Sequence, residues 1–85
     1  MITFTYTIKD KLGIHARPAG MLSKLAKEYK SEIYIEKGEK KALATRVIAI
    51  MGMGILYGDT VSVTVSGEDE ESAAEAVKSY FIKNL

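Results

Sequence analysis

The sequence predicts a small α+β domain of two layers, in which helices pack on one side of an open antiparallel or mixed sheet. Its 85 residues are enough for one hydrophobic core and too few for two. Stretches that alternate apolar and polar side chains, typical of strands with one buried face, are interspersed with stretches of helical period. No repeat, linker or low-complexity segment interrupts them, so we expect one domain over residues 1–85.

The first strand and helix are the clearest elements. Apolar side chains alternate with threonines over residues 2–8, which predicts a strand with one wet face. After a turn at residues 9–13 the period becomes helical. Pro18 lacks an N–H and must lie in the first turn, so this helix begins close to residues 16–18. Its buried stripe is expected to contain Ala19, Leu22, Leu25, Ala26 and Tyr29.

The remaining elements follow in the order strand, strand, helix, strand, helix. We expect strands at residues 31–36, 42–45 and 60–66, with a charged turn at 37–41 around Gly38. The apolar segment 47–53 lacks clear alternation and is bounded by glycines, which indicates a short helix. The acidic segment GEDEE at 67–71 opens the last helix, where negative charge suits the helix dipole. Ala73, Val77 and Phe81 supply its buried stripe.

Composition narrows the class of protein. The absence of cysteine excludes disulfides and thiolate metal sites and fits a reducing compartment. The N-terminus MITFTYTIKD lacks the basic head and apolar run of a secretory signal, and the longest apolar-and-glycine run, residues 47–57, is too short to span a bilayer. We therefore expect a cytoplasmic, soluble chain with no direct membrane insertion.

Charge is distributed unevenly along the chain. Residues 1–50 carry ten Lys or Arg and five Asp or Glu, whereas residues 51–85 carry two and six. The basic residues form no dense run with interleaved aromatics, so nucleic acid is not an expected partner. The asymmetry fits either a normally solvated surface or a basic face that steers an acidic protein partner.

The only histidine, His15, lies in the segment LGIHARPAG at or just before the start of the first helix. An isolated histidine is usually a surface or structural residue, but three features favour chemistry here. Unpaired N–H groups of Ala16, Arg17 and Ala19 would give the helix start partial positive charge, which keeps the ring neutral and nucleophilic. The same groups would stabilise an anion on the ring. Arg17 would add a forked, permanently charged contact to a phosphoryl group.

Other uses of histidine lack the necessary partners. A metal site fails on ligand count, because there is one histidine, no cysteine and no carboxylate at a convincing spacing. Hydrolysis would need a base and an orienting third group, and no P-loop or dinucleotide glycine pattern occurs. Accepting and passing on a group is therefore the simplest role for His15.

The segment LGIHARPAG resembles the active-site segment of the HPr family, the histidine-containing phosphocarriers of the bacterial phosphoenolpyruvate-dependent sugar phosphotransferase system. The resemblance extends over the whole chain, including the GILYGD turn and the GEDEE helix start. It implies a fold of order βαββαβα, an open-faced two-layer sandwich with four antiparallel strands covered on one face by three helices.

The resemblance also implies roles for matching residues. His15 would accept a phosphoryl group on Nδ1 from enzyme I and pass it to enzyme IIA domains, with Arg17 beside the phosphate and the N–H groups of Ala16 and Arg17 holding it. The chain would be a phosphoryl-group carrier rather than a stand-alone enzyme. It would need no metal or organic cofactor and would act as a monomer. Partners would dock on an apolar patch beside the histidine, formed by Gly20, Met21, Lys24, Lys27, Val47, Ile48 and Met51.

Two positions depart from the family pattern. Arg46 stands where many members carry a serine that an ATP-dependent kinase modifies, so that regulation is in doubt, and we expect Arg46 to face an acidic partner. Gly20 replaces a hydroxyl residue or alanine. These departures leave open a regulatory module of the same fold, either a nitrogen-type relay or a protein whose phosphorylation state is read by a transcriptional regulator. The sugar itself is not readable from this chain.

Overall fold

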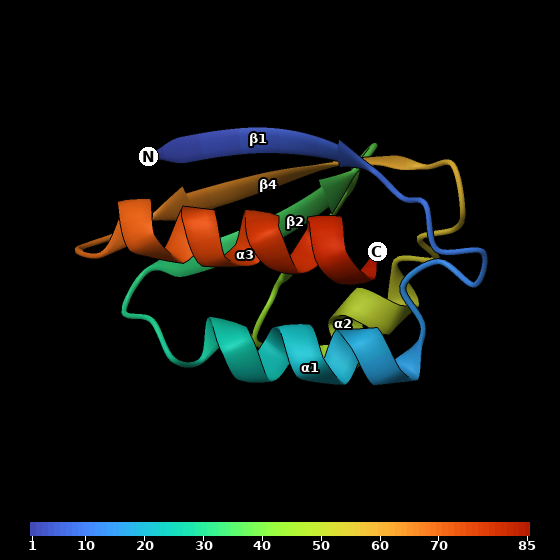
Figure 1. Ribbon diagram of the computed structural model, residues 1–85, viewed down its shortest axis with the longest axis horizontal. Helices are drawn as coiled ribbons and strands as arrows, with labels where there is room; N and C mark the ends of the chain where they lie inside the picture. The colour runs from blue at the N-terminus through green and yellow to red at the C-terminus, as the bar shows by residue number, and fades with distance from the viewer.

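Four strands form one antiparallel sheet in the computed structural model, which describes residues 1–85 (Figure 1). The strands are β1 (Ile2–Thr7), β2 (Glu32–Lys37), β3 (Lys40–Leu43) and β4 (Thr60–Ser66), in the spatial order β1-β4-β2-β3. The helices α1 (Ala16–Ala26), α2 (Val47–Gly52) and α3 (Glu70–Asn84) lie on one side of this sheet. The predicted element order and the two-layer sandwich are confirmed. None of the helices has the length and apolar composition needed to cross a membrane.

The alternation along the strands separates the buried face of the sheet from its open face. Every second residue of the central strand β4 is fully buried, and the serine and threonine side chains between them stay partly exposed. The same pattern in β2 buries Ile33 and Ile35. The core is a single cluster of 20 buried apolar residues contributed by the sheet, the helices and their connections. Burying this apolar surface is the main force that holds the helices on the sheet.

Helix α3 covers β1 and β4 with the stripe that its sequence predicts. Ala73, Val77 and Phe81 are completely buried. The ring of Phe81 meets Tyr6 and Phe4 of β1 edge-on, with ring centroids 5.5 and 6.2 Å apart. Such edge-to-face aromatic pairs add to the stabilisation from burial alone.

The β2–β3 hairpin is tighter than the sequence predicts. We expected a five-residue charged turn at 37–41 and a strand over 42–45, but β3 covers Lys40–Leu43 and Lys37 pairs with Lys40. Gly38 adopts a positive φ of 59°, which permits a connection of only two residues. Residues 44 and 45 instead lead into α2, with the N–H of Ala44 donating to the Ile33 carbonyl at 2.8 Å.

Strand β2 begins at Glu32 rather than at Ser31, because Ser31 is held by the start of α3. The carboxylate of Asp69 accepts hydrogen bonds from the N–H of Lys30 at 2.9 Å and from the N–H and hydroxyl of Ser31 at 3.0 and 2.6 Å. These bonds, with the Ser31 hydroxyl first among them, lower the pKa of Asp69 below its usual value. Glu70 and Glu71 occupy the first turn of α3, where the helix dipole favours them as predicted.

The loop before α1 lies directly against the loop before β4. The N–H of Ile14 donates to the Ile55 carbonyl at 3.1 Å. Gly13 has a φ of +69°, and a Cβ added there would lie 2.3 Å from the Ile55 oxygen and 2.8 Å from Cα of Leu56. Only glycine permits both this conformation and this approach. The contact therefore fixes where the chain enters α1.

The second of these loops is itself braced by a carboxylate. Asp59 accepts the N–H of Leu56 at 2.8 Å and pairs with the Lys37 ammonium at 2.7 Å. The same ammonium donates to the Gly54 carbonyl at 2.9 Å. The Lys37 hydrogen bond, followed by the Leu56 N–H, lowers the pKa of Asp59 below its usual value.

We predict that Gly13→Ala destabilises the protein by about 3 kcal/mol or more, because the cost of a strained backbone is added to the cost of steric overlap with the Ile55 main chain. Gly38→Ala is the matched control, since its φ is +59° and no atom lies within 4 Å of an added Cβ. It should cost only about 1 kcal/mol. Urea unfolding of both variants measures the difference. Equal losses would contradict the close approach.

We predict that Asp59→Asn destabilises the protein near neutral pH and that its difference from wild type disappears in acid. Because the folded-state pKa of Asp59 lies below 3.8, its stabilisation is complete above that value and is lost as pH falls through the folded pKa. Unfolding free energies of both proteins over a pH series test this. A difference that stays constant into strong acid would contradict the role of the ionised carboxylate.

Candidate functional site

His15 is the N-cap residue of α1, as predicted, and its backbone is extended with φ −96° and ψ −172°. Its side chain makes no capping hydrogen bond, and 38% of it is exposed. Histidine is not a favoured N-cap residue. The local structure therefore leaves the imidazole free for chemistry.

The start of α1 presents two unpaired N–H groups beside the histidine, those of Ala16 and Arg17. Pro18 follows and has no N–H. The prediction that Ala19 has an unpaired N–H is wrong, because this N–H already donates to the His15 carbonyl at 3.0 Å as the first hydrogen bond of the helix. The anion-binding capacity is thus concentrated on the two residues directly after His15.

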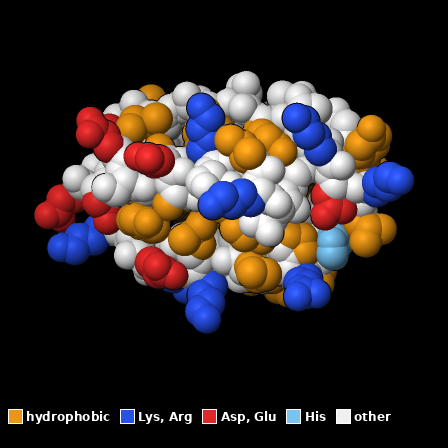
Figure 2. All heavy atoms as spheres, viewed as in Figure 1, with side chains coloured by type: hydrophobic (Ala, Val, Ile, Leu, Met, Phe, Trp, Pro, Cys, Tyr) orange, Lys and Arg blue, Asp and Glu red, His pale blue; other side chains and the backbone are white.

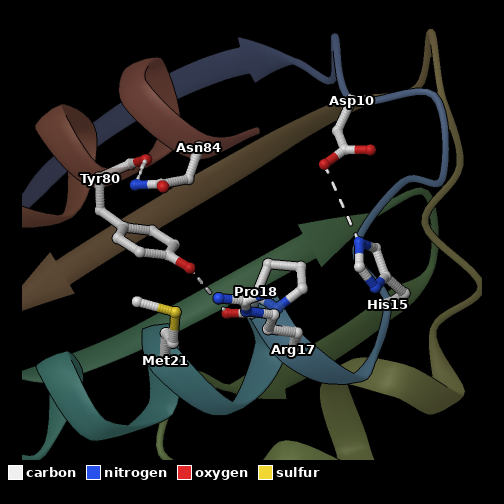
Figure 3. A pocket seen from close by; sticks show the side chains of 7 residues that line it. All are labelled: Asp10, His15, Arg17, Pro18, Met21, Tyr80 and Asn84. Atoms are coloured by element: carbon white, nitrogen blue, oxygen red, sulfur yellow. Dashed lines mark hydrogen bonds and ion pairs between the residues drawn. The ribbon is translucent and has the colours of Figure 1, made fainter.

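His15 and Arg17 share a surface cavity of about 310 Å³ at this end of the molecule (Figure 3). The Arg17 side chain is exposed and forms no ion pair within the chain. A permanently charged guanidinium without an internal partner can bind an anion from solution at no cost in broken contacts. The lining residues are Asp10, His15, Arg17, Pro18, Met21, Tyr80 and Asn84.

Three of these lining residues were not identified from the sequence. Asp10 places Oδ2 3.9 Å from Nε2 of His15, a single carboxylate near the ring that the sequence pattern did not predict. Tyr80 and Asn84 come from α3, more than 60 residues away along the chain. An Asp five residues before the histidine, in a turn segment, was the only available local signal.

Tyr80 joins α3 to the first turn of α1. Its hydroxyl donates to the Pro18 carbonyl at 3.1 Å, and Asn84 Nδ2 donates to the Tyr80 carbonyl at 3.1 Å. Burial raises the pKa of the Tyr80 hydroxyl, so it stays protonated and remains a donor. The cavity is therefore built on two packed helices, which limits movement of the histidine end of α1.

Apolar side chains remain exposed beside the site. Ile48 on α2 is 81% exposed, Met21 on α1 is 51% exposed and Met51 on α2 is 41% exposed. Val47 is partly buried and packs against the core. The apolar patch expected beside the histidine is therefore open to solvent at Met21, Ile48 and Met51. Lys24 and Lys27 are exposed, Gly20 is partly buried, and Arg46 is the exposed N-cap residue of α2.

Acidic side chains are distributed unevenly along the long axis of the molecule. Figure 2 shows acidic side chains gathered mainly at one end, where α3 begins, and the histidine at the other end. Two cations lie at helix starts near the histidine. Arg17 is in the first turn of α1, and Arg46 is the N-cap residue of α2. No three His, Cys, Asp or Glu side chains cluster closely enough to hold a metal ion anywhere in the chain.

Comparison with known proteins assigns this arrangement to one family. Residues 2–83 match the family model of the phosphotransferase system HPr component phosphorylation site. The chain is 35% identical to the phosphocarrier protein HPr of Mycoplasma capricolum over 82 residues, covering 96% of this chain and 92% of that protein. It is 41% identical to the phosphocarrier protein NPr of Shewanella violacea over 71 residues, covering 84% and 78%.

A solved structure supports the same assignment. The fold matches that of a mycoplasma histidine-containing phosphocarrier protein with a TM-score of 0.93 and 34% identity, covering 96% of this chain and 93% of that one. The match includes the four-stranded antiparallel sheet and the three helices on one face. This chain therefore belongs to the HPr family, the phosphocarrier proteins of the phosphotransferase system.

Proposed function

We propose that this chain carries a phosphoryl group on Nδ1 of His15, accepting it from the phosphohistidine of enzyme I and passing it to enzyme IIA domains during sugar uptake. The observation that supports this most directly is the imidazole at the N-cap of α1, which is followed by two unpaired N–H groups and lines the same cavity as the unpaired guanidinium of Arg17. The family match supports a phosphocarrier, and our proposal adds the identity of the phosphoryl donor and acceptor.

The chemistry needs little besides position and charge. The Nδ1 lone pair attacks phosphorus as the nitrogen–phosphorus bond of the donor breaks, and transfer to the acceptor reverses these events. Negative charge on the phosphoryl oxygens would be met by the N–H groups of Ala16 and Arg17 and by the Arg17 side chain. In-line placement within a transient complex supplies the rest of the rate.

The exposed apolar residues supply the docking surface of this proposal. Ile48, Met21 and Met51 offer apolar area that the fold itself leaves unburied. Methionine side chains adapt to partners of different shape, which a carrier with several acceptors requires. Gly20, Val47, Lys24, Lys27 and Arg46 complete the surface, and its cations suit acidic partners. One small face that successive partners share is consistent with a monomer.

A regulatory relay of the same fold is the second candidate. It is favoured by the similarity to a phosphocarrier protein NPr and by Arg46, which removes the hydroxyl at the start of α2. Both candidates use His15 in the same way. They differ in which donor charges the chain and which protein receives the phosphoryl group or reads the phosphorylated state.

We predict that phosphoenolpyruvate and a general enzyme I place an acid-labile, alkali-stable phosphate on the wild-type chain. His15→Ala and His15→Asn should abolish this labelling, because each removes the nucleophile. Asparagine is a favoured N-cap residue, so the second variant keeps α1 intact. Radiolabel transfer followed by addition of an enzyme IIA domain measures both steps.

Labelling that persists in both histidine variants would contradict the assignment of His15. Failure of the wild-type chain to accept phosphate from a competent enzyme I would reject the sugar-uptake role. Charging by a nitrogen-type enzyme I alone would then support the regulatory relay.

We predict that Arg46→Glu weakens binding to enzyme I about fivefold at low salt, because a cation facing an acidic partner becomes a repelling charge. The change places an acid at the N-terminus of α2, where the helix dipole favours it, so lost binding would not reflect an unfolded helix. Lys78→Glu makes the same charge change at an exposed position of α3 and should leave affinity nearly unchanged. Equal effects of the two variants would contradict a specific role for Arg46.

A further inference from the structure

Asp10, a partly buried residue of the turn before α1, is held by three hydrogen bonds. Its N–H donates to the main-chain oxygen of Leu85 at 2.8 Å, and its carbonyl accepts the N–H of Gly13 at 2.9 Å. One carboxylate oxygen, Oδ1, accepts the N–H of Leu12 at 2.9 Å. These three hydrogen bonds fix both the backbone and the plane of the carboxylate, so the direction of the second oxygen is set by the fold.

The second oxygen, Oδ2, points at the imidazole of His15 (Figure 3). It lies 3.9 Å from Nε2 and has no hydrogen-bond donor from the rest of the chain. The imidazole also has no other hydrogen-bond partner, and Nδ1 faces away from Asp10 (Figure 3). The gap exceeds a hydrogen bond by about 1 Å, and a half-exposed ring can close it by rotation. Hydrogen bonds of this kind often tighten only in the reacting complex.

We propose that Asp10 is a positioning residue that holds the proton of neutral His15 on Nε2 and so leaves the lone pair on Nδ1. A neutral imidazole carries one proton, and the nitrogen that donates to a carboxylate is the protonated one. The opposite assignment would place the proton on Nδ1, which then has no lone pair for phosphorus. Asp10 thereby determines which nitrogen is the nucleophile. The consequence for transfer rests on the proposed function.

The carboxylate also meets the charge that develops during transfer. When Nδ1 bonds to phosphorus, the ring gains positive charge while its proton stays on Nε2, and the donor nitrogen takes back the electron pair of its broken bond. The negative Asp10 lies at the Nε2 edge of the ring, away from Nδ1 (Figure 3), whereas the phosphoryl oxygens on Nδ1 would be met by the N–H groups of Ala16 and Arg17 and by the Arg17 side chain. The positive charge on the ring and the negative charge on the phosphoryl oxygens would then be compensated by different groups of the chain.

The test is Asp10→Asn, because the amide oxygen can still accept the N–H of Leu12 while the NH₂ group replaces Oδ2. A donor facing Nε2 favours the tautomer with the proton on Nδ1. The nitrogen-15 chemical shifts of His15, measured at alkaline pH where the ring is neutral, report the tautomer directly. We expect mainly Nε2–H in the wild-type chain, a shift toward Nδ1–H in the variant, and phosphoryl transfer about tenfold slower. Glu75→Gln removes the same charge outside the cavity and should change neither measurement.

Each outcome decides the proposal. An unchanged tautomer population would overturn it, even if transfer slows, since Asp10 would then act on partner binding. A shifted population with unchanged transfer would overturn its role in the reaction. If wild type and variant both fail to accept phosphate, the proposed function fails, and the tautomer measurement still decides whether Asp10 controls the proton.

Discussion

The close approach of Gly13 to the main chain at Ile55 is the constraint on which the site depends. It brings together two loops that lie 42 residues apart and anchors the entry to α1 on the connection that leads into β4. A side chain at position 13 would meet backbone, which cannot move aside as a flexible side chain can. His15 follows two residues later, so its location relative to the sheet is set before the helix begins.

Helix α3 fixes the same region from the other side. Leu85 accepts the N–H groups of Lys9 and Asp10, and Tyr80 donates to Pro18. The last turns of α3 therefore touch both the turn before the histidine and the helix after it. Since α3 is itself held to the sheet by Val77 and Phe81, the burial of apolar surface in the core is transmitted to the position of one exposed imidazole.

The molecule combines a closely packed frame with a candidate site that is open to solvent. The Arg17 side chain and the N–H groups of Ala16 and Arg17 have no partner within the chain, the only ion-pair contact of His15 is with the Asp10 carboxylate 3.9 Å from Nε2, and Ile48 is 81% exposed. Unsatisfied polar groups and exposed apolar side chains lower the stability of an isolated domain. The cost is small here because water solvates the polar groups and only a few apolar side chains are exposed. A bound phosphoryl group would supply partners for the polar groups, and a docking protein would cover the apolar ones.

The element order, the buried faces and the start of α1 could be predicted from the sequence, because period-two and helical patterns and the rules for proline act over a few residues. It also determined that His15, Ala16 and Arg17 stand together, since they are neighbours along the chain. That Asp10, Tyr80 and Asn84 line the same cavity, and that Ala19 has no free N–H, became visible in the folded chain alone. The first and last residues of β3 also could not be predicted from the sequence, because the ends of a strand depend on its pairing with the neighbouring strand. Contacts between segments that are far apart in the sequence depend on how the sheet and helices pack, and a pattern of a few neighbouring residues carries no information about that packing.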